Sequence, residues 1–162
     1  MGKKSFCALS AFVLAFALLA APFAQAVEAT RESYKEAVEP ICKTNVEANE
    51  RILKNVRAHV KAGKLKLAAS QFTKAADALK KAIPKLKAVP QPPADQANLT
   101  KWLKYIGEEE GYFRQIAKKL KAGDKNGATA MQIRLSHTAN QANNQVLAFE
   151  FKYCRVDPSK FS

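Results

Sequence analysis

Apolar residues recur every three or four positions in four successive segments, and this spacing constrains the fold of the 162-residue chain more than any other feature. It is the period of one face of an α-helix. The segments cover residues 31–62, 65–88, 95–121 and 125–153. Glycine is scarce, at six residues, whereas Ala, Lys, Leu and Gln, which favour helices, are abundant. The chain is therefore predicted to be all-α.

Two turns and one linker organise the four predicted helices. The first and third helices each end in Lys-Ala-Gly, at residues 61–63 and 121–123. Glycine readily adopts the left-handed conformation that stops a helix. The Pro-rich linker 89–94 separates two helical hairpins. Because short turns make successive helices antiparallel, we expect one domain, residues 27–162, folded as an antiparallel up-down-up-down four-helix bundle.

Two prolines fall inside predicted helices. Proline has no backbone N–H to donate, so it kinks a helix interior but is well tolerated in the first turn. At Pro40 the first helix is therefore expected either to kink or to begin. Pro84 is expected to bend or fray the last turn of the second helix.

Residues 1–26 have the order of a secretory signal peptide. Two lysines precede an apolar run over residues 6–21, and an A-x-A-like triplet follows at 24–26. The run is shorter than the roughly 20 apolar residues that span a bilayer, so removal is expected rather than retention as an anchor. The mature chain, from about residue 27, is predicted to be secreted or to reside in the extracytoplasmic cell envelope.

Two cysteines remain in the predicted mature chain, Cys42 and Cys154. An even number of cysteines in an exported chain indicates a disulfide. In the predicted bundle the start of the first helix and the end of the fourth lie at the same pole. We therefore expect these cysteines to pair there and to clip the ends of the chain together. In the chain-entropy model such a bond stabilises the fold by about 4–5 kcal/mol.

The usual cofactor and catalytic motifs are missing from the sequence. Di-iron bundles carry paired Glu-x-x-His motifs, and covalent haem needs Cys-x-x-Cys-His; neither occurs. The two histidines, His59 and His137, are predicted to point to opposite sides of their helices. No serine lies in the glycine elbow typical of hydrolases. We expect no metal, no cofactor and no catalytic residue, and hence a protein that is not an enzyme.

Polar side chains interrupt the apolar faces near the middle of the predicted bundle. Asn45 and Asn49 fall on the inward face of the first helix, Glu110 on that of the third, and Asn140 beside that of the fourth. The last three lie within about one helical turn of a common level. Three interpretations remain open: a satisfied polar layer that fixes helix pairing, exposure at an imperfect seam, or a pocket for a small ligand. The acidic run 108–110 is otherwise interpreted as a solvated helix face.

The predicted mature chain is strongly basic. Residues 1–26 carry two of the 27 Lys and Arg and none of the 14 Asp and Glu, so the chain without them has a net charge of +11. Residues 43–87 hold 12 basic and 3 acidic residues. Such a run is either a solvated helix face or a contact surface for anionic cell-wall polymer, lipid headgroups or an envelope protein. Nucleic acid is not expected as a partner outside the cytoplasm. The candidate contact residues are Arg51, Lys54, Arg57, Lys80, Lys81, Lys85 and Lys87.

Two short segments carry a resemblance. Residues 39–49 read Glu-Pro-Ile-Cys-Lys-Thr-Asn-Val-Glu-Ala-Asn, and the chain closes with Ala-Asn-Asn at 142–144 and Phe-Lys-Tyr-Cys at 151–154. These segments resemble a loose group of exported helical proteins, mostly from high-GC Gram-positive bacteria. The group has no assigned activity, so the resemblance implies pairing of Cys42 with Cys154 and no catalytic residue.

Together these features predict an exported, disulfide-linked, non-enzymatic helical bundle at the cell envelope. Its expected role is that of a binding or structural module with a basic surface for anionic partners. The alternative is a carrier of a small polar ligand that uses Asn45, Asn49, Glu110 and Asn140.

Overall fold

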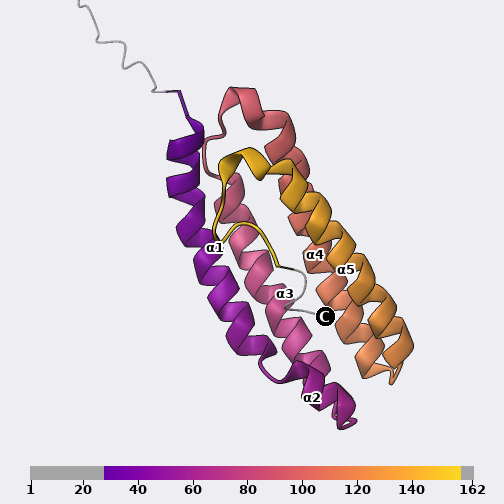
Figure 1. Ribbon diagram of the computed structural model, residues 1–162. Helices are drawn as coiled ribbons and strands as arrows, with labels where there is room; N and C mark the ends of the chain where they lie inside the picture. Colours follow the sequence, from indigo (N-terminus) through magenta and orange to yellow (C-terminus); the bar gives the residue numbers. More distant parts are fainter. Residues whose placement is uncertain (1–27, 158–162) are drawn as a thin grey trace, which may run out of the picture.

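The computed structural model describes residues 28–157, which form four long helices and three short helical segments (Figure 1). The predicted signal peptide, residues 1–26, lies outside the described residues. The all-α prediction is confirmed, because no residue between 28 and 157 lies in a strand. The elements are α1 Arg31–Leu53, α2 Val56–Lys61, α3 Leu65–Lys87, the 3-10 helix η1 Pro93–Asp95, α4 Gln96–Lys121, α5 Lys125–Gln145 and the 3-10 helix η2 Leu147–Phe149.

The long helices lie side by side, with α3 and α4 in the middle of the packing order (Figure 1). Helix α3 packs against both α1 and α4, and α5 packs against α4. Helix α4 consequently buries a broad face that carries Leu99, Trp102, Leu103, Ile106, Glu109, Phe113, Ile116, Ala117 and Leu120. Among the described residues, no helix is both long enough and apolar enough to cross a bilayer.

The prediction of one helix over residues 31–62 is wrong, because the chain breaks between α1 and α2. Asn55 adopts a left-handed conformation with φ 62°, which asparagine tolerates better than most residues. The break frees backbone carbonyls, and the Gln71 side chain of α3 satisfies two of them. Its Nε2 donates to the carbonyls of Ile52 at 2.7 Å and Lys54 at 3.0 Å. A long-range hydrogen bond thus stabilises an interruption that the local pattern does not announce.

Both prolines lie inside helices that continue past them. Helix α1 begins at Arg31, where Thr30 forms a capping box with Ser33, so the alternative that the helix begins at Pro40 is wrong. The Thr44 hydroxyl donates to the Pro40 carbonyl at 2.9 Å. Helix α3 runs three residues beyond Pro84 to Lys87, and Ala88 still donates to the Pro84 carbonyl at 3.1 Å, so the last turn is formed.

The fourth long helix ends at Gln145, eight residues before the predicted end at 153. Glu150, with φ 49°, then turns the chain, and residues 150–157, here called the strap, cross to α1 and run between α1 and α5 (Figure 1). The turn places Phe149 and Phe151 in an aromatic cluster with Tyr34 and Trp102. Ring centroids lie 5.0 Å apart for Phe149–Phe151, 5.7 Å for Tyr34–Phe149 and 5.8 Å for Trp102–Phe151. Burial of these rings favours the turn over continuation of the helix.

The predicted disulfide is confirmed: Cys42 and Cys154 are bonded, with an S–S distance of 2.07 Å and a Cα–Cα distance of 5.1 Å. Its predicted place at one pole is wrong. Cys42 lies in the middle of α1, and Cys154 reaches it because the strap folds back along the helices. Glu39 strengthens the attachment, since its carboxylate accepts from the backbone N–H of Lys152 at 2.5 Å and of Tyr153 at 2.9 Å. The bond therefore fixes the strap to the side of α1.

We expect removal of the disulfide to destabilise the whole fold. The bond joins residues 112 positions apart, and a loop of that length restricts the unfolded chain strongly. The double variant Cys42→Ser/Cys154→Ser should lose about 2–4 kcal/mol of unfolding free energy. Urea denaturation followed by circular dichroism measures the loss. A reductant should lower the midpoint of the wild type and leave the variant unchanged; equal midpoints for the oxidised wild type and the variant would contradict this expectation.

Candidate functional site

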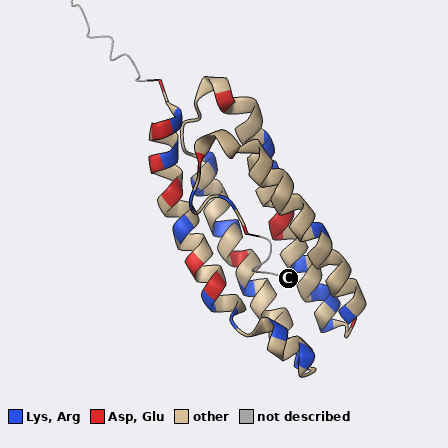
Figure 2. Ribbon diagram, viewed as in Figure 1, with Lys and Arg blue, Asp and Glu red and all other residues tan. Residues whose placement is uncertain are grey.

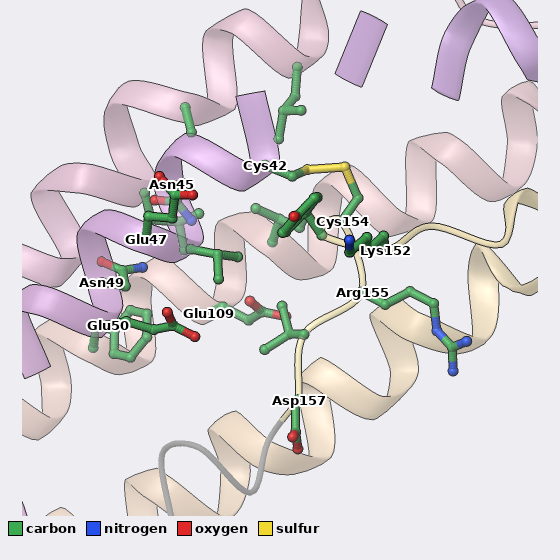
Figure 3. A pocket seen from close by; sticks show the side chains of 18 residues that line it. Cys42, Asn45, Glu47, Asn49, Glu50, Glu109, Lys152, Cys154, Arg155 and Asp157 are labelled. Carbon is green, nitrogen blue, oxygen red and sulfur yellow. A yellow bond between two sulfur atoms is a disulfide. The ribbon is translucent and has the colours of Figure 1, made fainter. Parts of the chain in front are cut away.

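A cavity of about 440 Å³ lies between α1, α3, α4 and the strap (Figure 3). Helices α3 and α4 supply an apolar wall that includes Leu79, Leu86, Ile106 and Phe113. Helix α1 supplies a more polar wall, and the strap forms the opposite side with residues 152–157. No residue of α5 lines this cavity. The strap thus takes the place beside α1 that a closely packed fourth helix would fill.

Three polar side chains within this cavity have an oxygen atom without a partner. Asn45 Oδ1, Asn49 Oδ1 and Glu109 Oε1 are buried and accept no hydrogen bond from any described residue. Asn49 and Glu109 are almost fully enclosed, with exposed fractions of 5% and 3%. Buried polar groups are normally paired, because leaving one unpaired costs about 1–3 kcal/mol. Their concentration in one cavity is the most unusual chemical feature of the described chain.

Glu109 is the deepest titratable group of the cavity. Burial removes water from its carboxyl group and raises its pKa from the ordinary value of 4.5 to about 8. The carboxyl group is therefore mostly protonated and uncharged at neutral pH. The other charged side chains of the lining are Glu47 and Glu50 on α1 and Lys152, Arg155 and Asp157 on the strap, all exposed.

The predicted polar layer is only partly assembled at this cavity. Asn45 and Asn49 line it, as the helical pattern predicts. Glu110 lies outside it and accepts a 2.5 Å hydrogen bond from Arg114, which also donates to Asp77 at 3.0 Å. Asn140 is exposed on α5. The structure therefore brings together two of the four predicted residues.

Glu109 is the site residue that the sequence pattern missed. Two stripes pass through α4: one runs through Ile106, Glu110 and Phe113, and the other through Ile106, Glu109 and Phe113. Both have helical spacing, so periodicity alone does not choose between the two glutamates. Because α4 is packed on both α3 and α5, the second stripe is also buried. The sequence did contain one indication. Trp102 lies seven residues, or about two helical turns, before Glu109, so it extends the second stripe on the same face of the helix.

The predicted anionic-contact residues are exposed but spread over the molecule. Arg51 and Lys54 lie around the end of α1, Arg57 lies on α2, and the other four lie along α3. Helix α3 is about 34 Å long at 1.5 Å per residue, and Lys87 is its last residue. Lys81 and Lys85 share a hollow between α1 and α3 with Asn45. The four residues of α3 are thus distributed along its second half.

A denser basic surface lies where the two glycine turns meet. The turn at Gly63 and the turn at Gly123 line one hollow with Lys64, Lys66 and Lys121. Figure 2 shows blue ribbon concentrated at this end of the molecule. We call it the basic pole; its exposed cations are Arg57, Lys61, Lys64, Lys66, Lys118, Lys121 and Lys125. Asp124 is the one acidic residue of these two turns, and it binds Lys119 at 2.9 Å.

The histidines do not contribute to a shared site. His59 Nδ1 lies 2.9 Å from Gln71 Oε1 beside the break after α1, and His137 is exposed on α5. Within residues 28–157, no group of three or more His, Cys, Asp or Glu is arranged to hold a metal ion.

Comparisons of the chain with protein-family models, with curated protein sequences and with solved structures find no match.

Burial of Glu109 should make the protein less stable as the pH rises. Between about pH 5 and pH 8 the unfolded carboxyl group loses its proton while the folded one keeps it. The free energy of unfolding should therefore fall by about 1.4 kcal/mol per pH unit from this group, and level off above the folded pKa. Glu109→Gln should remove this slope and be more stable than the wild type at pH 7 by about 2–3 kcal/mol. Urea denaturation at a series of pH values measures both effects.

Glu110→Gln is the matched control, because Glu110 is the neighbouring carboxylate and is held by Arg114. This variant should keep the slope of the wild type. Parallel stability curves for wild type and Glu109→Gln would contradict the assignment of the slope to Glu109.

Proposed function

We propose that this protein is an exported, non-enzymatic carrier or receptor that binds a small ligand in the cavity between α1, α3, α4 and the strap. The observation that carries the proposal is the set of unpartnered oxygens of Asn45, Asn49 and Glu109 in a cavity of about 440 Å³. That volume falls in the range of small-molecule sites, about 300–1,000 Å³. We further propose that the four long helices form an antiparallel up-down-up-down bundle, which the short glycine turns and the packing order support.

The state of the polar groups favours a ligand over the two structural interpretations. In a polar layer that fixes helix pairing, the oxygens of Asn49 and Glu109 would be bonded to one another or to a neighbour. At an imperfect seam they would be exposed. They are instead buried and unpartnered beside an open volume, an arrangement that a ligand with hydrogen-bond donors would stabilise.

The lining supports binding rather than chemistry. It contains no serine, no histidine and no free thiol, since its two cysteines form the disulfide. Glu109 is its one deeply buried titratable group, whereas acid–base catalysis commonly uses a positioned pair. The disulfide also supports the proposed extracytoplasmic location, because such bonds persist in oxidising compartments.

A filled cavity should abolish ligand capture. Ala82 on α3 lines the cavity and is 7% exposed, so Ala82→Phe places a ring inside it. The folded protein is mixed with small-molecule extract of the producing cells and examined by native mass spectrometry. We expect a bound mass on the wild type and at least a tenfold lower occupancy on Ala82→Phe.

Ala130→Phe is the matched control, because Ala130 is exposed on α5, away from the cavity. It should retain the bound mass. Absence of any bound mass on the wild type, or equal occupancy on Ala82→Phe, would contradict the proposed function.

A second candidate function is attachment to an anionic surface through the basic pole. The specific observation is the meeting of two Lys-rich turns around Gly63 and Gly123 with a single acidic residue between them. The field of such a cluster attracts phosphate-bearing surfaces, whether lipid headgroups or wall polymer. The basic pole and the face of α3 that carries Lys80, Lys81, Lys85 and Lys87 are therefore alternative contact surfaces.

Two variants with the same loss of charge distinguish these surfaces. In the pole variant Lys64, Lys66, Lys121 and Lys125 are changed to Gln, and in the face variant Lys80, Lys81, Lys85 and Lys87 are changed to Gln. Co-sedimentation with vesicles containing about one-third phosphatidylglycerol should fall at least tenfold for the pole variant in physiological salt and little for the face variant. The reverse order would assign the contact to α3, and no binding of the wild type even at low salt would exclude both surfaces.

A further inference from the structure

The cavity encloses three side-chain atoms that lack a hydrogen-bond partner. Its enclosed unpartnered atoms are all oxygens: two amide oxygens, of Asn45 and Asn49, and one carboxyl oxygen, of Glu109. The lining residues of α3, Leu79, Ala82 and Leu86, carry no polar side-chain atom. The two basic residues of the lining belong to the strap and are exposed. A ligand group placed against these oxygens would have to supply hydrogen-bond donors.

The enclosed carboxyl group also determines which charge a ligand can carry. An anionic ligand would meet Glu109, for which no ion pair exists among the described residues, whereas the exposed rim carries both acidic and basic side chains: Glu47, Glu50 and Asp157, and Lys152 and Arg155. In Figure 3 the Glu109 side chain lies between α1 and the strap, within reach of the open volume. Burying a charge is costly unless the charge is paired with one of opposite sign and hydrogen-bonded. The ligand group that suits this position is a cation.

We propose that the cavity binds an organic primary amine, with its ammonium group at Glu109 and its hydrocarbon stem against the apolar wall of α3 and α4. This inference rests on the proposed function and deepens it. An ammonium group is a compact cation with three N–H donors and no acceptor, which suits the unpartnered carboxyl oxygen of Glu109, and the amide groups of Asn45 and Asn49 lie in the same lining. Leu79, Leu86 and Phe113 supply the apolar contact for the stem.

Binding of such a cation is coupled to the ionisation of Glu109. The uncomplexed carboxyl group is mostly protonated at neutral pH because burial raises its pKa to about 8. The ammonium ion stabilises the carboxylate, so the carboxyl group gives up its proton as the amine enters. The other titratable groups that face the cavity are Glu47 and Glu50 on α1 and Lys152, Tyr153, Arg155 and Asp157 on the strap; α3 contributes none. Of these, all but the half-buried Tyr153 are exposed, and they change the field at the rim rather than the number of protons released at Glu109.

Isothermal titration calorimetry with three probes of equal stem length tests the proposal: n-hexylamine, 1-hexanol and hexanoate. The amine should bind at least tenfold more tightly than the alcohol, and hexanoate should not bind. The affinity for the amine should rise about tenfold between pH 6 and pH 7 and level off above pH 8. Titrations in two buffers of different ionisation enthalpy should show the release of close to one proton per amine at pH 7.

Glu109→Gln keeps the size of the side chain and removes its charge. This variant should lose at least tenfold in affinity for n-hexylamine, lose the pH dependence, and bind 1-hexanol as the wild type does. The unchanged alcohol binding shows that the cavity remains folded. Glu110→Gln is the matched control, because Glu110 is the adjacent carboxylate on α4, lies outside the cavity and is held by Arg114; the affinity of this variant for the amine should change less than threefold.

Failure of this proposal is distinguishable from failure of the proposed function. Binding of hexanol or hexanoate as tight as that of the amine, or full amine affinity in Glu109→Gln, would overturn the amine assignment while leaving a ligand cavity. Absence of amine binding at pH 8 would overturn it as well. The proposed function of the cavity fails only under a further condition. The native mass spectrometry experiment would also have to show either no bound mass on the wild type or an equal bound mass on Ala82→Phe.

Discussion

The covalent bond between Cys42 and Cys154 holds the strap beside α1, and the cavity exists because of that attachment. Without the strap, the cavity would open to solvent on the side that faces Asn45 and Asn49. The bond does not act alone: Glu39 accepts two backbone N–H groups of the strap, and the Asn143 side chain of α5 holds Val156 by hydrogen bonds of 2.7 and 2.9 Å. The strap is therefore fixed to α1 at one edge and to α5 at the other. A helix in its place would have packed against α1 and closed the volume.

The packing of helix α4 both stabilises the core and buries a carboxyl group at an energetic cost. It lies against α3 and α5, so it buries a broad face that includes the second stripe, through Ile106, Glu109 and Phe113. Most of these positions are apolar and contribute to the core, but the second stripe includes Glu109. The cost of burying that carboxyl group is met neither by an ion pair nor by a hydrogen bond to Oε1 among the described residues. Buried groups with strongly shifted pKa values occur preferentially at functional sites, so the burial of Glu109 by α4 supports the proposed ligand site.

The parts of the fold that follow from local chemistry were predictable. The glycine turns after residues 61 and 121, the all-α class and the pairing of the cysteines all depend on composition, spacing and compartment. The errors lie where a distant residue decides. Gln71 of α3 satisfies the carbonyls left free at the break after Leu53, and the aromatic partners Tyr34 and Trp102 draw Phe149 and Phe151 out of the helical path. Neither partner is adjacent in sequence to the feature that it determines.

The candidate site divides in the same way. The sequence by itself determined that Asn45 and Asn49 would face inward, because helical periodicity assigns them to the buried stripe of α1, and that a disulfide would connect α1 to the end of the chain. Only the tertiary structure decided that Glu109, and not Glu110, would be enclosed with them. Both glutamates satisfy the helical period, so the choice depends on which neighbours α4 packs against. The enclosure of Glu109 also depends on the path of the strap, because residues 152–157 form the wall of the cavity that lies opposite α1.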